Sequence, residues 1–206
     1  MRDADAAPVG LLMEFMPGGP LDLRIRGDSC PWADRLRWSV QASAGVAHLH
    51  DTCHVVHRDI LPDNILIDAA GNVKLADMAI SDVIGSSTFA DQPIVNLVYM
   101  PPEVRDQPYD MHGDVFALGL TLYEIMSGRH CFANEDTGER SNVELIVRAK
   151  SRARSDEDMA RAALSAGWPE WVPAAARELV GECIRLEPRS RPAARTMAER
   201  LLAMMG

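Results

Sequence analysis

The sequence predicts a mainly helical α+β domain that carries one short β-hairpin. Several stretches repeat apolar residues at helical spacing and end at glycine or proline. Two short apolar runs flank a turn that contains Gly71, which is typical of a hairpin. The chain has 206 residues, of which 47% are hydrophobic and 25% charged, and this suits one globular domain with a substantial core.

The first elements are predicted from their flanking residues. Val9 to Met13 is a short apolar run closed by prolines and glycines, so we expect a strand that continues into a loop. Ser29 is expected to cap a helix that Pro31 opens and that continues to Asp51.

The hairpin is predicted from Ile65 to Ile67 and from Val73 to Leu75, on either side of a short turn. Pairing of these strands would place Asn64 and Asp77 at neighbouring strand ends. One metal ion could then touch both side chains.

The second half of the chain is predicted to be helical. Ser151 to Gly167 is charged and rich in small residues, so we expect a surface connection with one extra helical turn. Proline and glycine boundaries predict the remaining helices over Met111 to Ser127, Asn142 to Lys150, Ala174 to Leu186, and Ala193 to Met205.

Charge and cysteine content narrow the classes of function. A net charge of −9 argues against a nucleic-acid or anionic-membrane surface. The four cysteines lack metal-ligand spacing, which fits reduced thiols in the cytosol. No signal peptide is recognisable, and the apolar run from Val115 to Leu122 is too short to span a bilayer. We therefore expect a cytoplasmic protein, and its oligomeric state is left open.

One group of polar residues has the spacing of a phosphoryl-transfer site. His57, Arg58 and Asp59 are followed by Asn64 and then by Asp77. Phosphoryl transfer needs a positioned hydroxyl and neutralised phosphate charge, and little covalent help from the protein. Asp59 suits the first task, and Asn64 and Asp77 offer the hard oxygen ligands that Mg²⁺ prefers.

These residues resemble the motifs of the protein kinase family. HRDILPDN at 57 to 64 is similar to the catalytic loop HRDxxxxN, and DMA at 77 to 79 stands where the family has DFG. Three later segments resemble the end of the activation segment, the long central helix and the late Arg-Pro, and one early segment resembles the fifth strand and hinge. They are Tyr99 to Glu103 (YMPPE), Asp114 to Gly119 (DVFALG), Arg191 with Pro192, and Leu11 to Leu21 (LLMEFMPGGPL).

A related architecture, that of the aminoglycoside phosphotransferases, has the loop HxDxxxxN. That group favours glycine where Arg58 stands, and it lacks a segment like the one that ends at Glu103. Both features favour the protein kinase branch, whose large C-terminal lobe the chain resembles.

The resemblance implies ATP and Mg²⁺ as cofactors and a protein as substrate or regulatory partner. Asp59 and Asn64 would be catalytic, and Asn64 and Asp77 would hold the metal. The backbone from Glu14 to Met16 would bind the adenine edge, and Leu66 would form the floor beneath adenine.

Other matched residues would have structural or regulatory roles. His57 and Asp114 would brace the catalytic loop, and Arg58 would await a phosphate or an acid on the activation segment. Glu103 and Arg191 would form a buried ion pair. The candidate phosphorylation sites are Ser86, Ser87 and Thr88.

The sequence also departs from the family pattern. Leu61 replaces the catalytic-loop lysine of Ser/Thr kinases, Asn96 replaces a threonine that works with that lysine, and Ala79 replaces the glycine of DFG. The lysines are Lys74 and Lys150, both after the catalytic loop. Neither can take the phosphate-anchoring position of the family.

We therefore expect a truncated kinase domain. Residues 1–20 would be a strand and hinge remnant, residues 21–206 the large lobe, and the small lobe would have no counterpart. The predicted function is ATP-dependent transfer to protein Ser or Thr, because Pro62 resembles HRDLKPxN, although this chain alone would be catalytically incomplete. The alternatives are a pseudokinase that binds partners and a lone helical interaction module.

Overall fold

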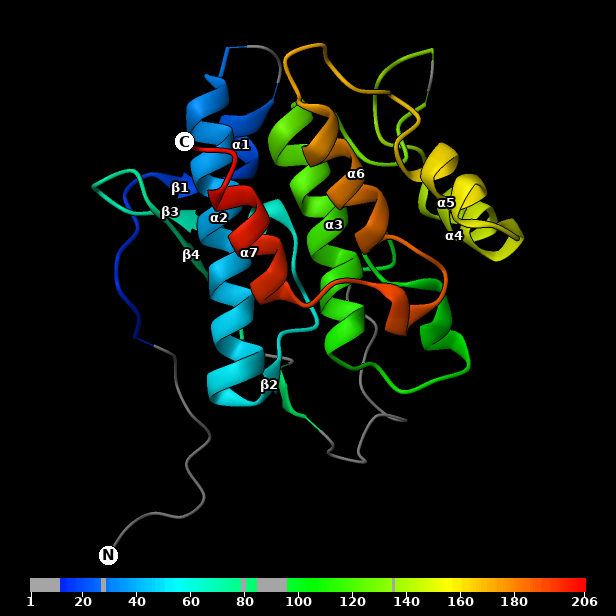
Figure 1. Cartoon of the computed structure of the whole chain (residues 1–206), viewed down its shortest axis with the longest axis horizontal. Helices are drawn as coiled ribbons and strands as arrows, with labels where there is room; N and C mark the ends of the chain where they lie inside the picture. The colour runs from blue at the N-terminus through cyan, green and yellow to red at the C-terminus, as the bar shows by residue number, and fades with distance from the viewer. Residues whose placement is uncertain (1–11, 27–28, 79–80, 85–95, 135) are drawn as a thin grey trace, which may run out of the picture.

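The computed structural model of the chain describes residues 12–26, 29–78, 81–84, 96–134 and 136–206 (Figure 1). The α-helices in this part are α1 (Asp22–Ile25), α2 (Trp32–His48), α3 (Met111–Ser127), α4 (Val143–Arg152), α5 (Asp156–Ala163), α6 (Ala174–Cys183) and α7 (Ala194–Leu202). The strands are β1 (Gly19–Pro20), β2 (Val55–Val56), β3 (Ile65–Ile67), β4 (Val73–Leu75) and β5 (Asp82–Val83). None of the helices in these residues combines the length and apolar character of a membrane span.

Helix α3 forms the centre of the fold, with α2 and α7 on one side and α6 on the other (Figure 1). It has the predicted bounds because both ends are capped. The Asp110 side chain accepts a hydrogen bond from His112 N, and Gly128 adopts the left-handed conformation, with φ 71°, at the C-terminus. Residues 113–127 are all buried, which explains the long apolar run.

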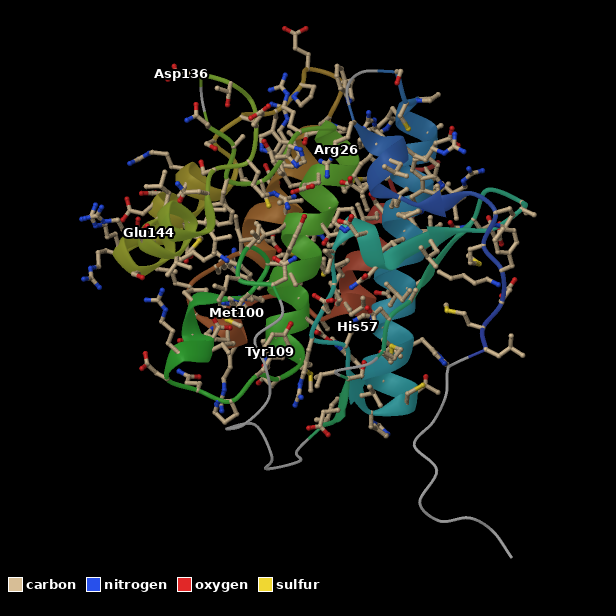
Figure 2. All side chains as sticks on the ribbon, turned by 180° about the vertical axis from the view of Figure 1, so that it is seen from behind. Arg26, His57, Met100, Tyr109, Asp136 and Glu144 are labelled. Atoms are coloured by element: carbon tan, nitrogen blue, oxygen red, sulfur yellow. The ribbon has the colours of Figure 1, made fainter. Side chains whose placement is uncertain are left out.

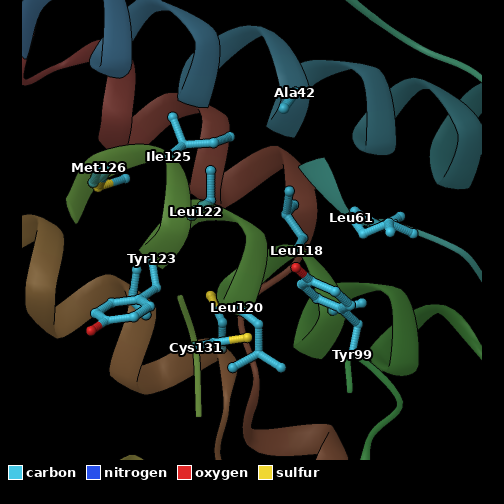
Figure 3. Close-up of a cluster of buried hydrophobic side chains, with 14 of the residues drawn as sticks. Ala42, Leu61, Tyr99, Leu118, Leu120, Leu122, Tyr123, Ile125, Met126 and Cys131 are labelled. Carbon is cyan, nitrogen blue, oxygen red and sulfur yellow. The ribbon is translucent and has the colours of Figure 1, made fainter. Parts of the chain in front are cut away.

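The hydrophobic core extends from α3 towards α2 and the neighbouring loops. Figure 3 shows Leu118 and Ile125 of α3 on the side of Ala42 in α2. Leu61 and Tyr99, which come from two different loops, approach the same cluster. Core packing therefore connects the loop after β2 with the segment before α3.

The predicted hairpin is confirmed. Strands β3 and β4 pair antiparallel, with Ile65 opposite Leu75 and Ile67 opposite Val73, and β1 adds to the outer side of β3. The Asp68 side chain accepts hydrogen bonds from backbone N–H groups of the turn, and Gly71 supplies the positive φ of 82° that the turn requires.

The predicted boundaries of the first elements are partly wrong. Residues 9–11 lie outside the described residues, and Leu12 and Met13 belong to no strand. Helix α2 begins after Pro31, and Ser29 does not cap it. The α-helix ends at His48, and one π-helical turn, Leu49–Cys53, follows it. The chain then leaves the helix at His54, which has a left-handed backbone conformation.

The region from Ser151 to Gly167 was predicted as a surface connection with one helical turn, and this is wrong in part. It contains the eight-residue helix α5, capped by the Ser155 side chain, which buries Met159 and Ala163. The charged composition concealed an amphipathic helix, since the two apolar residues lie four positions apart on one face.

Candidate active site

The loop between β2 and β3 is fixed from below by a buried carboxylate. The Asp114 side chain, on α3, accepts hydrogen bonds from His57 N at 2.7 Å and from Arg58 N at 2.9 Å. Arg58 has a φ of 71°, an unfavourable left-handed conformation for this residue type. Two hydrogen bonds to a charged acceptor offset that strain and hold the loop in one shape.

Two further side chains complete the environment of Asp114. His50 Nε2 lies 2.8 Å from Oδ2, and the Tyr109 hydroxyl donates to Oδ1 at 3.0 Å. Burial and the adjacent Asp114 charge raise the pKa of Tyr109 well above its ordinary value, so the hydroxyl stays a donor. Figure 2 labels His57 and Tyr109 near the first half of α3. The sequence did not reveal the role of Tyr109, because its only signal is its position just before the helix cap.

The His57 ring connects this loop to the end of β4. Asp59 N donates to Nδ1 at 3.3 Å, so we assign the ring proton to Nε2, which lies 3.0 Å from Ala76 O. Asp77 follows Ala76 directly. The buried His57 ring therefore holds Asp59 in a fixed position relative to Ala76, the residue before Asp77.

Asp59 and Asn64 are in direct contact. Asn64 Nδ2 donates to the Asp59 carboxylate oxygen Oδ2 at 2.7 Å and to Asp59 O at 2.9 Å. Burial raises the pKa of the Asp59 carboxyl, with Asp77 and Asp63 acting in the same direction, while the hydrogen bond from Asn64 and the nearby His57 oppose the shift. The result is a fixed carboxylate with an increased affinity for a proton.

Asn64 and Asp77 flank the paired strands, as the hairpin predicts. Ala76 N donates to Asn64 O at 2.8 Å, which aligns the start of β3 with the residues after β4. Asp77 has a φ of 59°, so its backbone is strained. The residue is exposed, so its carboxylate is accessible to a ligand.

The donor set fits Mg²⁺ bound together with a phosphate. Because Asn64 Nδ2 faces two acceptors, Oδ1 is the atom left for a ligand, and Asp77 adds a carboxylate. Among the described residues, no group of three His, Cys, Asp or Glu side chains is placed to hold a metal. Two protein oxygens suit a magnesium ion that takes its other ligands from water and substrate.

Arg58 is paired with an acid further along the chain. Its guanidinium donates to Asp82 Oδ2 at 2.8 Å, and both side chains are largely buried. Asp82 lies in β5, which pairs with β2 beside the loop. The candidate phosphorylation sites Ser86, Ser87 and Thr88 lie outside the described residues, and so does Ala79.

Glu103 and Arg191 form a bidentate ion pair across the fold. Arg191 Nη1 and Nη2 donate to the two carboxylate oxygens at 2.5 and 2.9 Å. Arg191 also donates to Arg185 O and His112 O and covers the Phe116 ring. The pair joins the segment before α3 to the C-terminal region.

The three residues predicted to contact adenine lie in different surroundings. Glu14 is exposed, and its carboxylate pairs with Lys74 at 2.6 Å. Met16 O accepts a hydrogen bond from Gly19 N in a turn, whereas Leu66 is half-buried in β3. The adenine roles of these residues stay predictions.

In the described residues, a central helix supports an HRD loop within a mainly helical lobe. This arrangement is that of the large lobe of protein kinases. The chain belongs to the protein kinase family, because the family model described as protein kinase domain matches residues 4–202. It is 28% identical to serine/threonine-protein kinase 12 of Arabidopsis thaliana over 96% of this chain and 42% of that protein. It is also 31% identical to the human serine/threonine-protein kinase Nek5, over 92% of this chain and 25% of that protein. The chain therefore spans less than half the length of either relative.

Proposed function

We propose that this chain supplies the catalytic large lobe of an ATP-dependent protein phosphotransferase. The contact between Asp59 and Asn64, on a loop held by Asp114, supports the proposal most strongly. It joins a proton acceptor and a metal ligand in one fixed unit.

Asp59 would orient the acceptor hydroxyl and receive its proton. Asn64 occupies Oδ2, and Oδ1 accepts no hydrogen bond from the described residues. The hydroxyl proton passes to Asp59 as the hydroxyl oxygen bonds to the γ-phosphorus and the bond to ADP breaks. The raised pKa of Asp59 favours this role, since a proton acceptor works best when its pKa approaches the ambient pH.

Asn64 Oδ1 and the Asp77 carboxylate would hold Mg²⁺. When bound, the ion would neutralise phosphate charge during transfer. The exposure of Asp77, and the backbone hydrogen bond from Ala76 N to Asn64 O beside it, support this role.

The phosphate-anchoring cation of the family would have to come from outside these residues. Lys74 pairs with Glu14 on the surface, and Lys150 is buried in α4. Leu61, at the position of the catalytic-loop lysine, is only 8% exposed and belongs to the core. We therefore expect little transfer by this chain alone.

Transfer to Ser or Thr is the proposed specificity. Pro62 follows the pattern HRDLKPxN, and both relatives named above are called serine/threonine-protein kinases. Asp82 would act as a permanent acidic partner of Arg58, which would reduce the need for a phosphate on the activation segment.

A pseudokinase is the second candidate, and the burial of Leu61 favours it. Loss of one preorganised donor to a developing negative charge costs about 2.7–4 kcal/mol of transition-state stabilisation. A protein that tolerates this loss could retain nucleotide binding and act on partners without transfer.

Transfer of ³²P from ATP to a Ser/Thr peptide library tests the proposal in the complete natural polypeptide. We compare the native protein with Asp59→Asn and with the control Glu199→Gln, which changes an exposed carboxylate on α7. We expect Asp59→Asn to lower the rate at least about 100-fold, in line with the loss of general-base catalysis, and the control to retain it.

A native protein that transfers no phosphate, but binds ATP with Mg²⁺, would favour the pseudokinase. Transfer that survives Asp59→Asn would contradict the role proposed for the loop.

A further inference from the structure

Lys150 is a buried lysine in the part of α4 that faces the segment before α3. The residue is only 5% exposed, although lysine side chains are rarely buried. Its position on α4 brings its ammonium to the turn formed by residues 97–100. This turn lies just before Glu103, close to the end of the segment that resembles the kinase activation segment.

The ammonium is surrounded by backbone carbonyls. Lys150 Nζ donates to Leu97 O at 2.9 Å, to Val98 O at 2.5 Å and to Met100 O at 2.6 Å. It also lies 5.6 Å from the centre of the Phe116 ring and 5.0 Å from that of Phe132. Three carbonyls satisfy all three donors of an ammonium, and the aromatic faces add cation–π attraction.

Burial of this charge is costly, so the carbonyl contacts must offset a large loss of hydration. Burial lowers the pKa of Lys150 to about 7, and Arg105 acts in the same direction, whereas Cys131 and Glu103 oppose the shift. The three carbonyls also favour the charged form, because they accept hydrogen bonds from it. Contacts with the turn therefore replace the water that the buried ammonium has lost.

Within the described residues, two further hydrogen bonds hold the backbone of the turn. Met100 N donates to Asn96 O at 3.2 Å, and Val98 N donates to the Asn96 side chain at 3.1 Å. Tyr99 is fastened through its hydroxyl to Glu124 of α3. These contacts use donors of the turn, whereas Lys150 donates to three of its carbonyls.

We propose that Lys150 is a positioning residue that gathers the carbonyls of Leu97, Val98 and Met100 and thereby sets the shape of the turn 97–100. The turn and α4 border a cleft of about 180 Å³, so the same contacts set the width of that cleft. Tyr99 also shares a buried cluster with Leu61, two residues after Asp59 (Figure 3), and Val98 belongs to the same cluster.

The consequence for catalysis rests on the proposed function: a displaced turn would disturb the packing beneath the catalytic loop.

Amide hydrogen exchange of the complete natural polypeptide tests this proposal without requiring nucleotide binding or turnover. We compare Lys150→Met, which keeps the length but removes the donors, with Lys150→Arg, which keeps charge and donors. Arg148→Met is the matched control, because it removes an exposed charge from the same helix. We expect Lys150→Met to accelerate exchange over residues 96–103 at least about tenfold and to leave α3 unchanged, because unsatisfied buried carbonyls favour opening of the turn.

Lys150→Arg is expected to restore most of the protection, and Arg148→Met to retain all of it. Native-like exchange over residues 96–103 in Lys150→Met would overturn the proposal. Equal acceleration in α3, or global unfolding of that variant, would also overturn it, because Lys150 would then stabilise the fold without selectively positioning the turn. Failure of the transfer assay above would leave these outcomes unaffected.

Discussion

Replacement of Glu103 by glutamine should destabilise the domain far more than the same change in a surface ion pair. The Arg191 side chain is 0% exposed and that of Glu103 is 11% exposed. Removal of one partner from a buried ion pair costs about 3–5 kcal/mol, because the other charge remains buried without compensation. We expect about 3 kcal/mol for Glu103→Gln, since the amide keeps one acceptor and Arg191 keeps two backbone carbonyls.

The matched control is Asp51→Asn. Asp51 pairs with Arg195 at 2.8 Å, but the two side chains are 40% and 64% exposed. Exposed pairs contribute about 0–1 kcal/mol, so the control should change stability by less than 1 kcal/mol.

Equilibrium unfolding in urea, followed by circular dichroism, gives the free energy of unfolding for native protein, both variants and Arg191→Gln. A double-mutant cycle with Glu103→Gln and Arg191→Gln should yield a coupling energy of about 2 kcal/mol or more, within the range of contacting residues. If Glu103→Gln lay within 1 kcal/mol of Asp51→Asn, the buried pair would not join the segment before α3 to the C-terminal region.

Three further predictions concern packing and reactivity. Gly119→Ala should destabilise the fold by about 1–3 kcal/mol, because the new Cβ would lie 2.5 Å from Cys183 Cβ. The control Gly181→Ala in α6 places a Cβ with nothing within 4 Å and should stabilise the fold by about 0.5–1 kcal/mol. Thermal unfolding compares the two variants, and equal effects would contradict the close approach of α3 and α6. Leu61→Lys should lower the free energy of unfolding by about 2–4 kcal/mol, because it removes a buried apolar side chain and introduces a charge, while Asp63→Lys stays within about 0.5 kcal/mol. An unchanged Leu61→Lys stability in urea would mean that this position opens towards the site. Cys53 should react fastest with a thiol reagent in the native protein, because it is exposed, whereas burial raises the pKa of Cys131 and Cys183; reaction of those two before unfolding would refute their place in the core.

Capping and turn residues explain which elements could be predicted from the sequence. Asp110 and Gly128 fix both ends of α3, and Gly71 fixes the hairpin turn, so local residues set the bounds of these elements. Helix α5 was underestimated because its two buried residues, Met159 and Ala163, lie among charged ones. Eight residues give only a weak amphipathic pattern, and the helix depends on packing against the rest of the fold.

The site shows the same division. The spacing of Asp59, Asn64 and Asp77 follows from one loop and one hairpin, so the sequence indicated that they could lie together. The hydroxyl of Tyr109 on Asp114 and the ammonium of Lys150 on the turn 97–100 could not be predicted, because each contact depends on tertiary packing. A lysine also carries no sequence signal of burial, since its usual place is the surface.

If Asn64 and Asp77 form the metal side of a nucleotide site, as proposed, ATP binding must depend on Mg²⁺ and on Asp77, and calorimetry measures both. The complete natural polypeptide would be titrated with ATP in the presence and absence of Mg²⁺, together with Asp77→Asn and Asp59→Asn. We expect saturable binding that requires Mg²⁺, weakens at least about tenfold in Asp77→Asn and persists in Asp59→Asn. Absence of Mg²⁺-dependent binding, or equal binding by Asp77→Asn, would contradict this proposal and favour an interaction module that binds no nucleotide.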